Sequence, residues 1–300
     1  MSASPTQSGS LTLEANGRRS SALTQGEGPV VLLVHGFPDH NATFRHQLPA
    51  LAEAGYRAVA PMLRGYEPSS QLRRRIADQH PLQVALDLAA WARSLGKGKP
   101  IHLIGHDWGA IVAYVVAALE PTLFRSATAI AVPPLDALEK GIRKHPVQIR
   151  NSWYTLFFQL RGLSDAVVRA RDFAFIEKLW RDWSPGWSWE PETMAALKNT
   201  FRKPDVLWYA LAYYRATLNP FLPDSRRMTE VMKQPTDVPM LAITGATDGC
   251  MDTRIFDCVD TQRFRKGYCL ERIPGAGHFC HQEKPDRVNA LLLDWLADHS

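Results

Sequence analysis

Short apolar runs that alternate with amphipathic helical runs constrain the fold of this 300-residue chain more than any other feature. Residues 30–34 form a continuous apolar run, which is typical of a strand buried on both faces. This alternation predicts an α/β fold, in which helices flank a mostly parallel central sheet on both faces. Comparable apolar runs stand at 57–60, 101–104, 128–132, 240–244 and 269–273, with helical patterns at 82–95, 109–119 and 286–298.

The stretch from 134 to 223 breaks this alternation, because it has helical patterns at 152–160 and 206–218 and no clear buried strand. It also holds six of the nine tryptophans. We therefore expect a helical cap domain at 134–223, inserted into a core domain whose two parts are 1–133 and 224–300. Within the first part, the polar residues 1–10 predict a loose tail, and residues 11–25 predict a hairpin that turns at Asn16-Gly17.

Composition and charge argue against several classes of protein. The longest apolar stretch, 109–119, is too short to span a membrane, and the polar N-terminus does not resemble a secretory signal, so we expect a cytoplasmic protein. The net charge of +5 includes one short basic run, at 73–75, which does not predict nucleic-acid binding. The four cysteines are spaced by 8, 11 and 11 residues, which matches no zinc pattern. We expect free thiols, no metal and no cofactor.

The most specific motif is Gly105-His106-Asp107-Trp108-Gly109, which lies between an expected strand and an apolar helix. A nucleophile between two glycines in a strand–turn–helix context is typical of a nucleophile elbow. Its central residue here is Asp107, whose carboxylate is ionised near neutral pH and needs no base to activate it. The alternative is that Asp107 is an incidental residue at a helix N-terminus.

A carboxylate nucleophile favours displacement at carbon over esterase or peptidase chemistry. Attack on an sp³ carbon forms an alkyl ester with the enzyme, which water can then cleave at its carbonyl group. Two classes of substrate suit this chemistry: epoxides, whose ring opens, and haloalkanes, from which a halide leaves.

Two further residues follow expected strands at their carboxyl ends, where the active sites of open α/β sheets form. His278 follows the strand at 269–273 and is the candidate base, while Asp248 follows the strand at 240–244 and is the candidate acid that orients it. Asp252 and His281 are the alternatives for these two roles, and Asp248 could also be a plain turn residue.

The segment His35-Gly36-Phe37-Pro38 follows the first buried strand. A backbone N–H from this loop and the N–H after the nucleophile would form an oxyanion hole, which predicts Phe37 and Trp108 for this role. We expect His35 and Pro38 to contribute to the substrate-binding site, unless the segment is only a turn.

Taken together, these motifs resemble the α/β-hydrolase fold family, and within it the epoxide hydrolase branch, which is related to the haloalkane dehalogenases. The resemblance rests on 35–38, Arg64-Gly65-Tyr66, the elbow at 105–109, the loop at 245–248 and Gly277-His278-Phe279, in the family's order along the chain. Glu67, which follows Tyr66, departs from the small residue common in the family, and no role is predicted for it.

The resemblance also implies two tyrosines that hydrogen-bond the epoxide oxygen. In this family they stand in patterns like Ser152-Trp153-Tyr154 and Tyr213-Tyr214-Arg215, which implies Tyr154 and Tyr214, with Tyr213 as the alternative if the helix register differs by one. Either tyrosine could instead pack at the interface with its hydroxyl at the rim. Trp153 is expected to contact substrate.

The sequence thus predicts an epoxide hydrolase that converts an apolar epoxide and water to a vicinal diol. A haloalkane dehalogenase with the same nucleophile is the first alternative, because Trp108 could donate to a halide, and a receptor-like protein with a ligand pocket is the second. The Trp- and Phe-rich insertion favours an apolar substrate. Both a monomer and a homodimer are compatible with the sequence.

Overall fold

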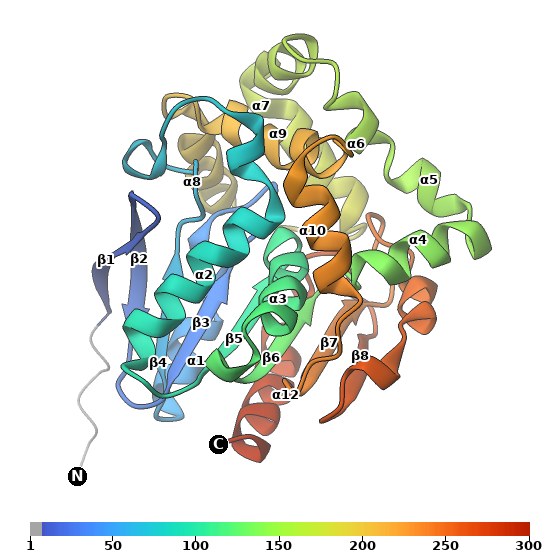
Figure 1. The fold of residues 1–300 in the computed structure, drawn as a ribbon. Coiled ribbons are helices and arrows are strands. Elements are labelled where there is room, and N and C mark those ends of the chain that lie inside the picture. The colour runs from blue at the N-terminus through green and yellow to red at the C-terminus, as the bar shows by residue number, and fades with distance from the viewer. Residues whose placement is uncertain (1–7) are drawn as a thin grey trace.

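The computed structural model describes residues 8–300, which form one eight-stranded sheet with helices on both faces (Figure 1). The strand order is β1-β2-β4-β3-β5-β6-β7-β8; β1, β2 and β4 pair antiparallel, and all pairs from β4 to β8 are parallel. The expected mostly parallel sheet is therefore confirmed. The strands are β1 (Gly9–Ala15), β2 (Arg18–Gln25), β3 (Val30–Val34), β4 (Arg57–Pro61), β5 (Ile101–His106), β6 (Phe124–Ile130), β7 (Met240–Gly245) and β8 (Tyr268–Ile273).

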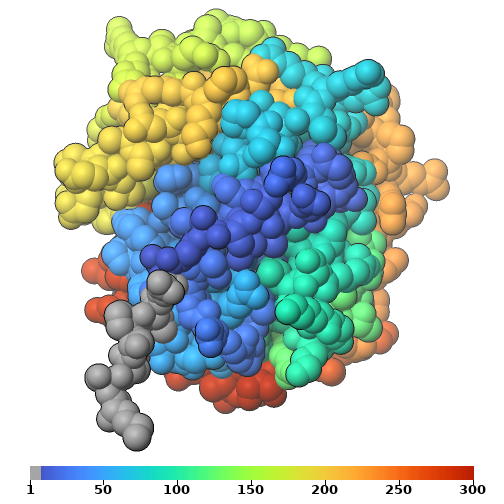
Figure 2. Space-filling view, turned by 90° about the vertical axis from the view of Figure 1, so that its left-hand side faces the viewer, coloured from blue at the N-terminus to red at the C-terminus, as the bar shows by residue number. Residues whose placement is uncertain are grey.

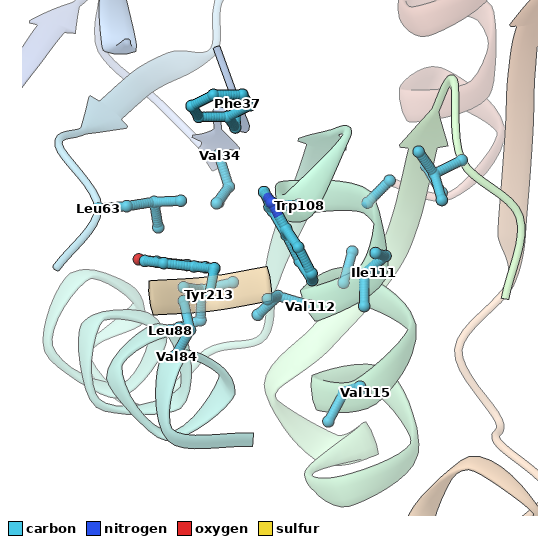
Figure 3. Close-up of a cluster of buried hydrophobic side chains, with 14 of the residues drawn as sticks. Val34, Phe37, Leu63, Val84, Leu88, Trp108, Ile111, Val112, Val115 and Tyr213 are labelled. Carbon is cyan, nitrogen blue, oxygen red and sulfur yellow. The ribbon is translucent and has the colours of Figure 1, made fainter. Parts of the chain in front are cut away.

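Two apolar cores lie on opposite faces of this sheet, because successive side chains of a strand point to opposite faces. In β3, Leu32 and Val34 belong to the larger core and Val31 and Leu33 to the smaller one. The helices α2 (Pro81–Gly96) and α3 (Trp108–Leu119) cover the larger core, part of which Figure 3 shows. The helices α1 (Gln47–Glu53) and α12 (Pro285–Asp298) cover the other face.

Between β6 and β7 the chain forms a series of helices joined by loops, as Figure 1 shows. In this stretch α7 changes direction at residues 170–173, where three consecutive residues have positive φ angles. Aromatic contacts join Tyr214 of α9 to Phe37 and Trp108, so α9 packs over the loops that follow β3 and β5. The helices are α4 (Leu135–Lys144), α5 (Val147–Asn151), α6 (Trp153–Phe157), α7 (Leu163–Trp183), α8 (Pro191–Arg202), α9 (Val206–Thr217) and α10 (Pro223–Met232); the short α11 (Cys280–Glu283) follows β8.

The N-terminal hairpin begins earlier than expected. Strand β1 starts at Gly9, which pairs with Thr24, so the last residues of the expected loose tail belong to the sheet. Residues 1–7 of that tail lie outside the described part of the chain. The turn falls at Asn16-Gly17, and both residues have the positive φ angles that a tight hairpin turn requires.

Within residues 8–300, no helix has both the length and the apolar character needed to cross a bilayer. The four cysteines are free thiols; Cys250 and Cys280 are buried, and Cys269 is exposed.

Candidate active site

Asp107 stands on a tight turn between β5 and α3. Its backbone has φ 53° and ψ −112°, a conformation that non-glycine residues rarely adopt. The turn depends on its glycines: a Cβ on Gly105 would lie 2.1 Å from the carbonyl oxygen of Gly109, and one on Gly109 would lie 2.0 Å from that of Val34. The side chain of Asp107 makes no capping hydrogen bond to α3, so it does not act as an ordinary N-cap residue.

The two oxygens of the Asp107 carboxylate have different surroundings. Oδ1 accepts a hydrogen bond of 2.6 Å from the backbone N–H of Phe37. Oδ2 lies 3.6 Å from Nε2 of His278. Gly36 makes this approach possible, because a Cβ there would lie 2.3 Å from Oδ1. One oxygen is thus held by the loop after β3, and the other faces the imidazole of His278.

His278 lies between two carboxylates. Its Nδ1 is 2.9 Å from Oδ2 of Asp248, whose Oδ1 accepts hydrogen bonds from the N–H groups of Cys250 and Met251. These bonds fix the Asp248 carboxylate so that it can orient the imidazole ring. The structure therefore brings Asp107, His278 and Asp248 together in a row.

The neighbouring carboxylates also change the proton affinity of this imidazole. Burial disfavours the charged form of His278, but Asp248 and Asp107 outweigh that effect and hold the pKa of His278 well above its usual range. The loss of charge on one carboxylate would therefore lower this pKa and favour the neutral imidazole, which is the form that can accept a proton.

The alternative acid and base have other partners. Asp252 caps a short 3₁₀ helix and forms an ion pair with Arg254 on the surface. His281 lies behind the elbow, and its Nε2 is 2.7 Å from Oγ1 of Thr43.

A cavity of about 190 Å³ lies beside Asp107, between the elbow and the helices that follow β6. About half of its lining residues are polar or aromatic, and the others are aliphatic or thioether. The polar and aromatic lining residues are Asp107, Trp108, Ser152, Tyr154, Thr155, Tyr214, Thr217 and Cys250. A pocket of this composition suits an apolar ligand with one polar group. The aliphatic and thioether residues of the lining are Ile111, Val132, Leu135, Leu138, Ile142, Leu218 and Met251.

The two cavity tyrosines differ in their hydrogen bonding. The Tyr154 hydroxyl lies 3.3 Å from Sγ of Cys250, whereas the buried Tyr214 hydroxyl has no hydrogen-bond partner within residues 8–300. Burial raises the pKa of both phenols well above their usual range, so both are protonated and can donate. Their rings are 5.7 Å apart.

Tyr213, the alternative to Tyr214, points elsewhere. Its hydroxyl donates a 3.0 Å hydrogen bond to the carbonyl oxygen of Arg64, and its ring packs in the core beside Leu88 and Trp108 (Figure 3). The structure thus places Tyr214, and not Tyr213, in the cavity.

Three residues expected at the substrate lie outside the cavity lining. Trp153 is 41% exposed and packs against Phe157 and Phe175, because it lies on the side of α6 opposite to the cavity. The ring of His35 is buried and bonds to backbone atoms of its own loop and of Leu63, so it shapes the loop rather than the pocket.

Pro38, the third of these residues, also belongs to the loop structure. Its carbonyl oxygen accepts a hydrogen bond of 2.9 Å from the indole N–H of Trp180, and the peptide bond between Phe37 and Pro38 is cis. Glu67, for which no role was predicted, accepts a hydrogen bond of 2.7 Å from the Ser21 hydroxyl and so joins its loop to β2.

Cys250 is a site residue that sequence reasoning missed. It is buried, lines the cavity, contacts the Tyr154 hydroxyl, and donates its backbone N–H to Asp248. The only signal in the sequence was its position two residues after Asp248, which says nothing about where a thiol points.

Two groups of three residues bring possible metal-binding atoms within 4.8 Å of one another. Asp248, Cys250 and His278 belong to the site described above, and Asp39, His106 and His281 form a buried cluster behind the elbow. His106 donates from Nε2 to the carbonyl oxygen of His278, and the Asp39 carboxylate accepts from Gln282. These bonds give the buried cluster behind the elbow a structural role in holding the His278 loop.

Comparison with known proteins identifies the family of this chain. A model of the Alpha/beta hydrolase family matches residues 31–291. Epoxide hydrolase 3 of Xenopus tropicalis is 29% identical, covering 97% of this chain and 78% of that protein, and the AB hydrolase superfamily protein YfhM of Bacillus subtilis is 27% identical, covering 92% and 93%. The crystal structure of Epoxide Hydrolase A from Mycobacterium thermoresistibile is 26% identical, with a TM-score of 0.81 over 97% of this chain and 98% of that one.

Proposed function

The chain belongs to the alpha/beta hydrolase family, and from this premise we propose that it is an epoxide hydrolase that converts an apolar epoxide and water to a vicinal diol. One observation carries the proposal: the cavity joins the Asp107 carboxylate to the phenol hydroxyls of Tyr154 and Tyr214. An epoxide needs both a nucleophile for its carbon and proton donors for its oxygen. The names of several relatives support the same activity.

In the first step, Oδ2 of Asp107 attacks one epoxide carbon and the bond from that carbon to the epoxide oxygen breaks. The electron pair of that bond goes to the oxygen, which takes a proton from Tyr154 or Tyr214 as it leaves. Asp107 now carries an alkyl ester at Oδ2, and Oδ1 becomes its carbonyl oxygen. The hydrogen bond from Phe37 to Oδ1 supports this assignment of the two oxygens.

In the second step, His278 removes a proton from a water molecule, which attacks the ester carbonyl carbon. Ester formation removes the Asp107 charge that helps to hold the pKa of His278 high, so this pKa falls and the neutral imidazole, the form that can act as a base, is favoured. The N–H groups of Phe37 and Trp108 stabilise the oxyanion. Collapse of the intermediate breaks the bond from the carbonyl carbon to the alkyl oxygen, which takes the proton held by His278 and leaves as the diol. The carboxyl group of Asp107 then loses its proton, which returns to the tyrosine phenolate, so that the carboxylate and both phenols are restored.

We further propose that the helices of 134–223 act as a cap over the carboxyl ends of the strands. They supply Tyr154 and Tyr214 as well as much of the aliphatic lining, while the core supplies Asp107, Asp248 and His278. Exclusion of water by such a cap would strengthen the interaction of the two phenols with the developing alkoxide.

A haloalkane dehalogenase is the second candidate, and one observation favours it. The indole N–H of Trp108 is buried at the cavity and has no hydrogen-bond partner among the described residues, so it could donate to a halide. A halide leaves without a proton, however, and would not use the two phenol donors.

The test is the intact mass of the His278→Gln variant after it is mixed with styrene oxide or, separately, with 1-bromobutane. We expect an adduct of the full mass of the epoxide, which the additional substitution Asp107→Asn abolishes. An adduct from the bromide alone would favour the dehalogenase. Absence of any adduct, together with no diol formation by the wild-type protein across a panel of apolar epoxides, would refute the proposal and leave a binding protein.

A further inference from the structure

Large apolar side chains are exposed along one side of the chain from α5 to the first turns of α7. They are Ile149, Trp153, Leu156, Leu160, Leu163 and Val167, with exposed fractions from 39% to 66%, and we call them the exposed stripe. Ile149 lies on α5, Trp153 and Leu156 on α6, Leu160 in the turn after it, and Leu163 and Val167 at the start of α7. Within a helix, residues three or four apart lie on the same face, as do Trp153 with Leu156 and Leu163 with Val167. Figure 1 shows that this stretch forms the outer edge of the helical layer.

The stripe is a local feature of this surface. Among residues 8–300, nine large apolar side chains are strongly exposed, and eight of them lie between 149 and 221. The remaining one, Leu72, lies between β4 and α2. Contiguous exposed apolar surface of this kind marks a binding site for a protein or a membrane.

Basic side chains predominate beside the stripe. Between 144 and 171 every charged side chain classed as exposed is basic, and the one acidic residue there, Asp165, is half-buried and forms an ion pair with Arg215. Exposed acidic residues flank this stretch on both sides, where Glu139 pairs with Arg143 and Asp172 pairs with Arg202. The exposed basic residues of the stretch are Lys144, Arg150, Arg161, Arg169 and Arg171.

The stripe also adjoins the cavity. In the α5–α6 segment, Ser152, Tyr154 and Thr155 line the cavity, while Trp153 and Leu156 point away from it. Leu218 is 47% exposed and lines the cavity as well, so the cavity reaches the surface on this side of the molecule. In Figure 2 the yellow-green atoms around residues 155–170 form the top of the molecule.

We propose that the exposed stripe and its basic rim dock the protein on an anionic lipid surface. An apolar face with a Trp residue, flanked by Lys and Arg, is the composition that lies in the interface of a bilayer with its apolar side chains among the acyl chains. Anionic headgroups would pair with the basic rim. This proposal concerns a surface, so it stands whether or not the protein opens epoxides.

A second copy of the chain fits this surface less well. A twofold interface would set the same patch against itself, so the basic rim of one copy would face the basic rim of the other. Like charges across an interface are repulsive, and the exposed acidic residues that flank this stretch, Glu139 and Asp172, already pair with basic residues of the same chain. An anionic partner avoids that repulsion.

The test is cosedimentation of the full chain with vesicles of phosphatidylcholine alone and of phosphatidylcholine mixed with phosphatidylglycerol. We expect binding to the mixed vesicles only, and weaker binding at high salt because salt screens the basic rim. The double substitution Leu156→Glu and Leu160→Glu should weaken binding at least about tenfold. The pair Arg150→Gln and Arg161→Gln should weaken it by about fivefold for each residue.

The matched control combines Leu72→Glu with Arg73→Gln, which changes an exposed leucine and an exposed arginine outside the stripe. This control should bind like the wild type, and thermal melting should show that all variants fold. Wild-type protein that does not bind the mixed vesicles, or equal losses in the stripe and control variants, would overturn the proposal. So would a wild-type dimer in light scattering that Leu156→Glu converts to a monomer without any vesicle binding.

Discussion

The unpaired hydroxyl of Tyr214 leads to a prediction about stability. This hydroxyl is buried at the cavity, and no acceptor for its proton lies among the described residues. The Trp108 indole lies close to it but outside hydrogen-bond geometry, so folding removes the hydroxyl from water and returns no well-formed hydrogen bond. Such a group costs about 1–3 kcal/mol of folding free energy. The substitution Tyr214→Phe deletes the hydroxyl and keeps the ring, so it should stabilise the fold by about that amount. For a chain of this length the midpoint of thermal unfolding should rise by about 2–5 °C.

The neighbouring tyrosine is the matched control. Tyr213 is equally buried, but its hydroxyl donates to the carbonyl oxygen of Arg64. Tyr213→Phe removes the same atom and leaves that buried carbonyl without its donor, which should destabilise the fold by about 1–3 kcal/mol. The two substitutions remove the same atom at adjacent positions. The stability changes are expected to have opposite signs because the two hydroxyls differ in their hydrogen bonding.

Activity should also distinguish the two variants, because Tyr214→Phe, the more stable one, should be the less active one. If Tyr214 donates to the epoxide oxygen, Tyr214→Phe should lower kcat/KM about 10²–10³-fold, as expected for the loss of one donor to a developing oxyanion. Calorimetry and initial rates of styrene oxide hydrolysis measure the two quantities. A Tyr214→Phe protein that melts below the wild type, as Tyr213→Phe should, would refute the assignment of an unpaired hydroxyl. A fully active Tyr214→Phe protein would remove Tyr214 from the proposed chemistry.

Three other changes test the remainder of the site. Asp248→Asn removes the carboxylate that orients His278, so ester hydrolysis should slow about ten-thousandfold and the Asp107 ester should accumulate, visible as an adduct by mass spectrometry. Gly36→Ala places a Cβ 2.3 Å from Oδ1 of Asp107, so ester formation should be lost while thermal melting still shows a folded protein; near-wild-type rates would contradict the geometry of the elbow. Burial raises the pKa of Asp39 to about 7. The folded state therefore binds more protons than the unfolded state between about pH 4 and 7, and stability should fall as the pH rises through that window. Asp39→Asn should flatten this fall, and urea unfolding at pH 5 and pH 8 measures it.

The core of the site could be predicted from sequence because its residues follow strands. Asp107 comes directly after a parallel strand, and Asp248 and His278 lie in the loops that follow two others. The carboxyl ends of parallel strands meet at one edge of the sheet. The three side chains meet in the structure for that reason. The glycines of the elbow were informative because the close approach of Gly109 to Val34 leaves no space for a Cβ.

Residues on the helices between β6 and β7 were harder to place. A helix turns by a large angle at each residue, so a shift of one position moves a side chain from the cavity to the core or the surface. Tyr213 and Tyr214 differ in this way, as do Tyr154, which lines the cavity, and Trp153, which does not. Cys250 could not be found because its role depends on contacts with Tyr154, which is 96 positions away in the chain.

Several buried polar atoms near Asp107 lack a hydrogen-bond partner, and this favours a ligand-binding role for the cavity. Within the described residues, the Tyr214 hydroxyl, the Trp108 indole N–H and Nε2 of His278 are all buried without a hydrogen-bond partner. Each such atom destabilises the fold, and most buried polar groups in proteins are paired. A cavity kept only for packing would pair or replace these three groups. Nε2 of His278 lies 3.6 Å from Oδ2 of Asp107, and Trp108 and Tyr214 line the cavity beside it. This grouping is better explained by a ligand that supplies the missing partners, with an oxygen for the phenol and a water molecule for the imidazole.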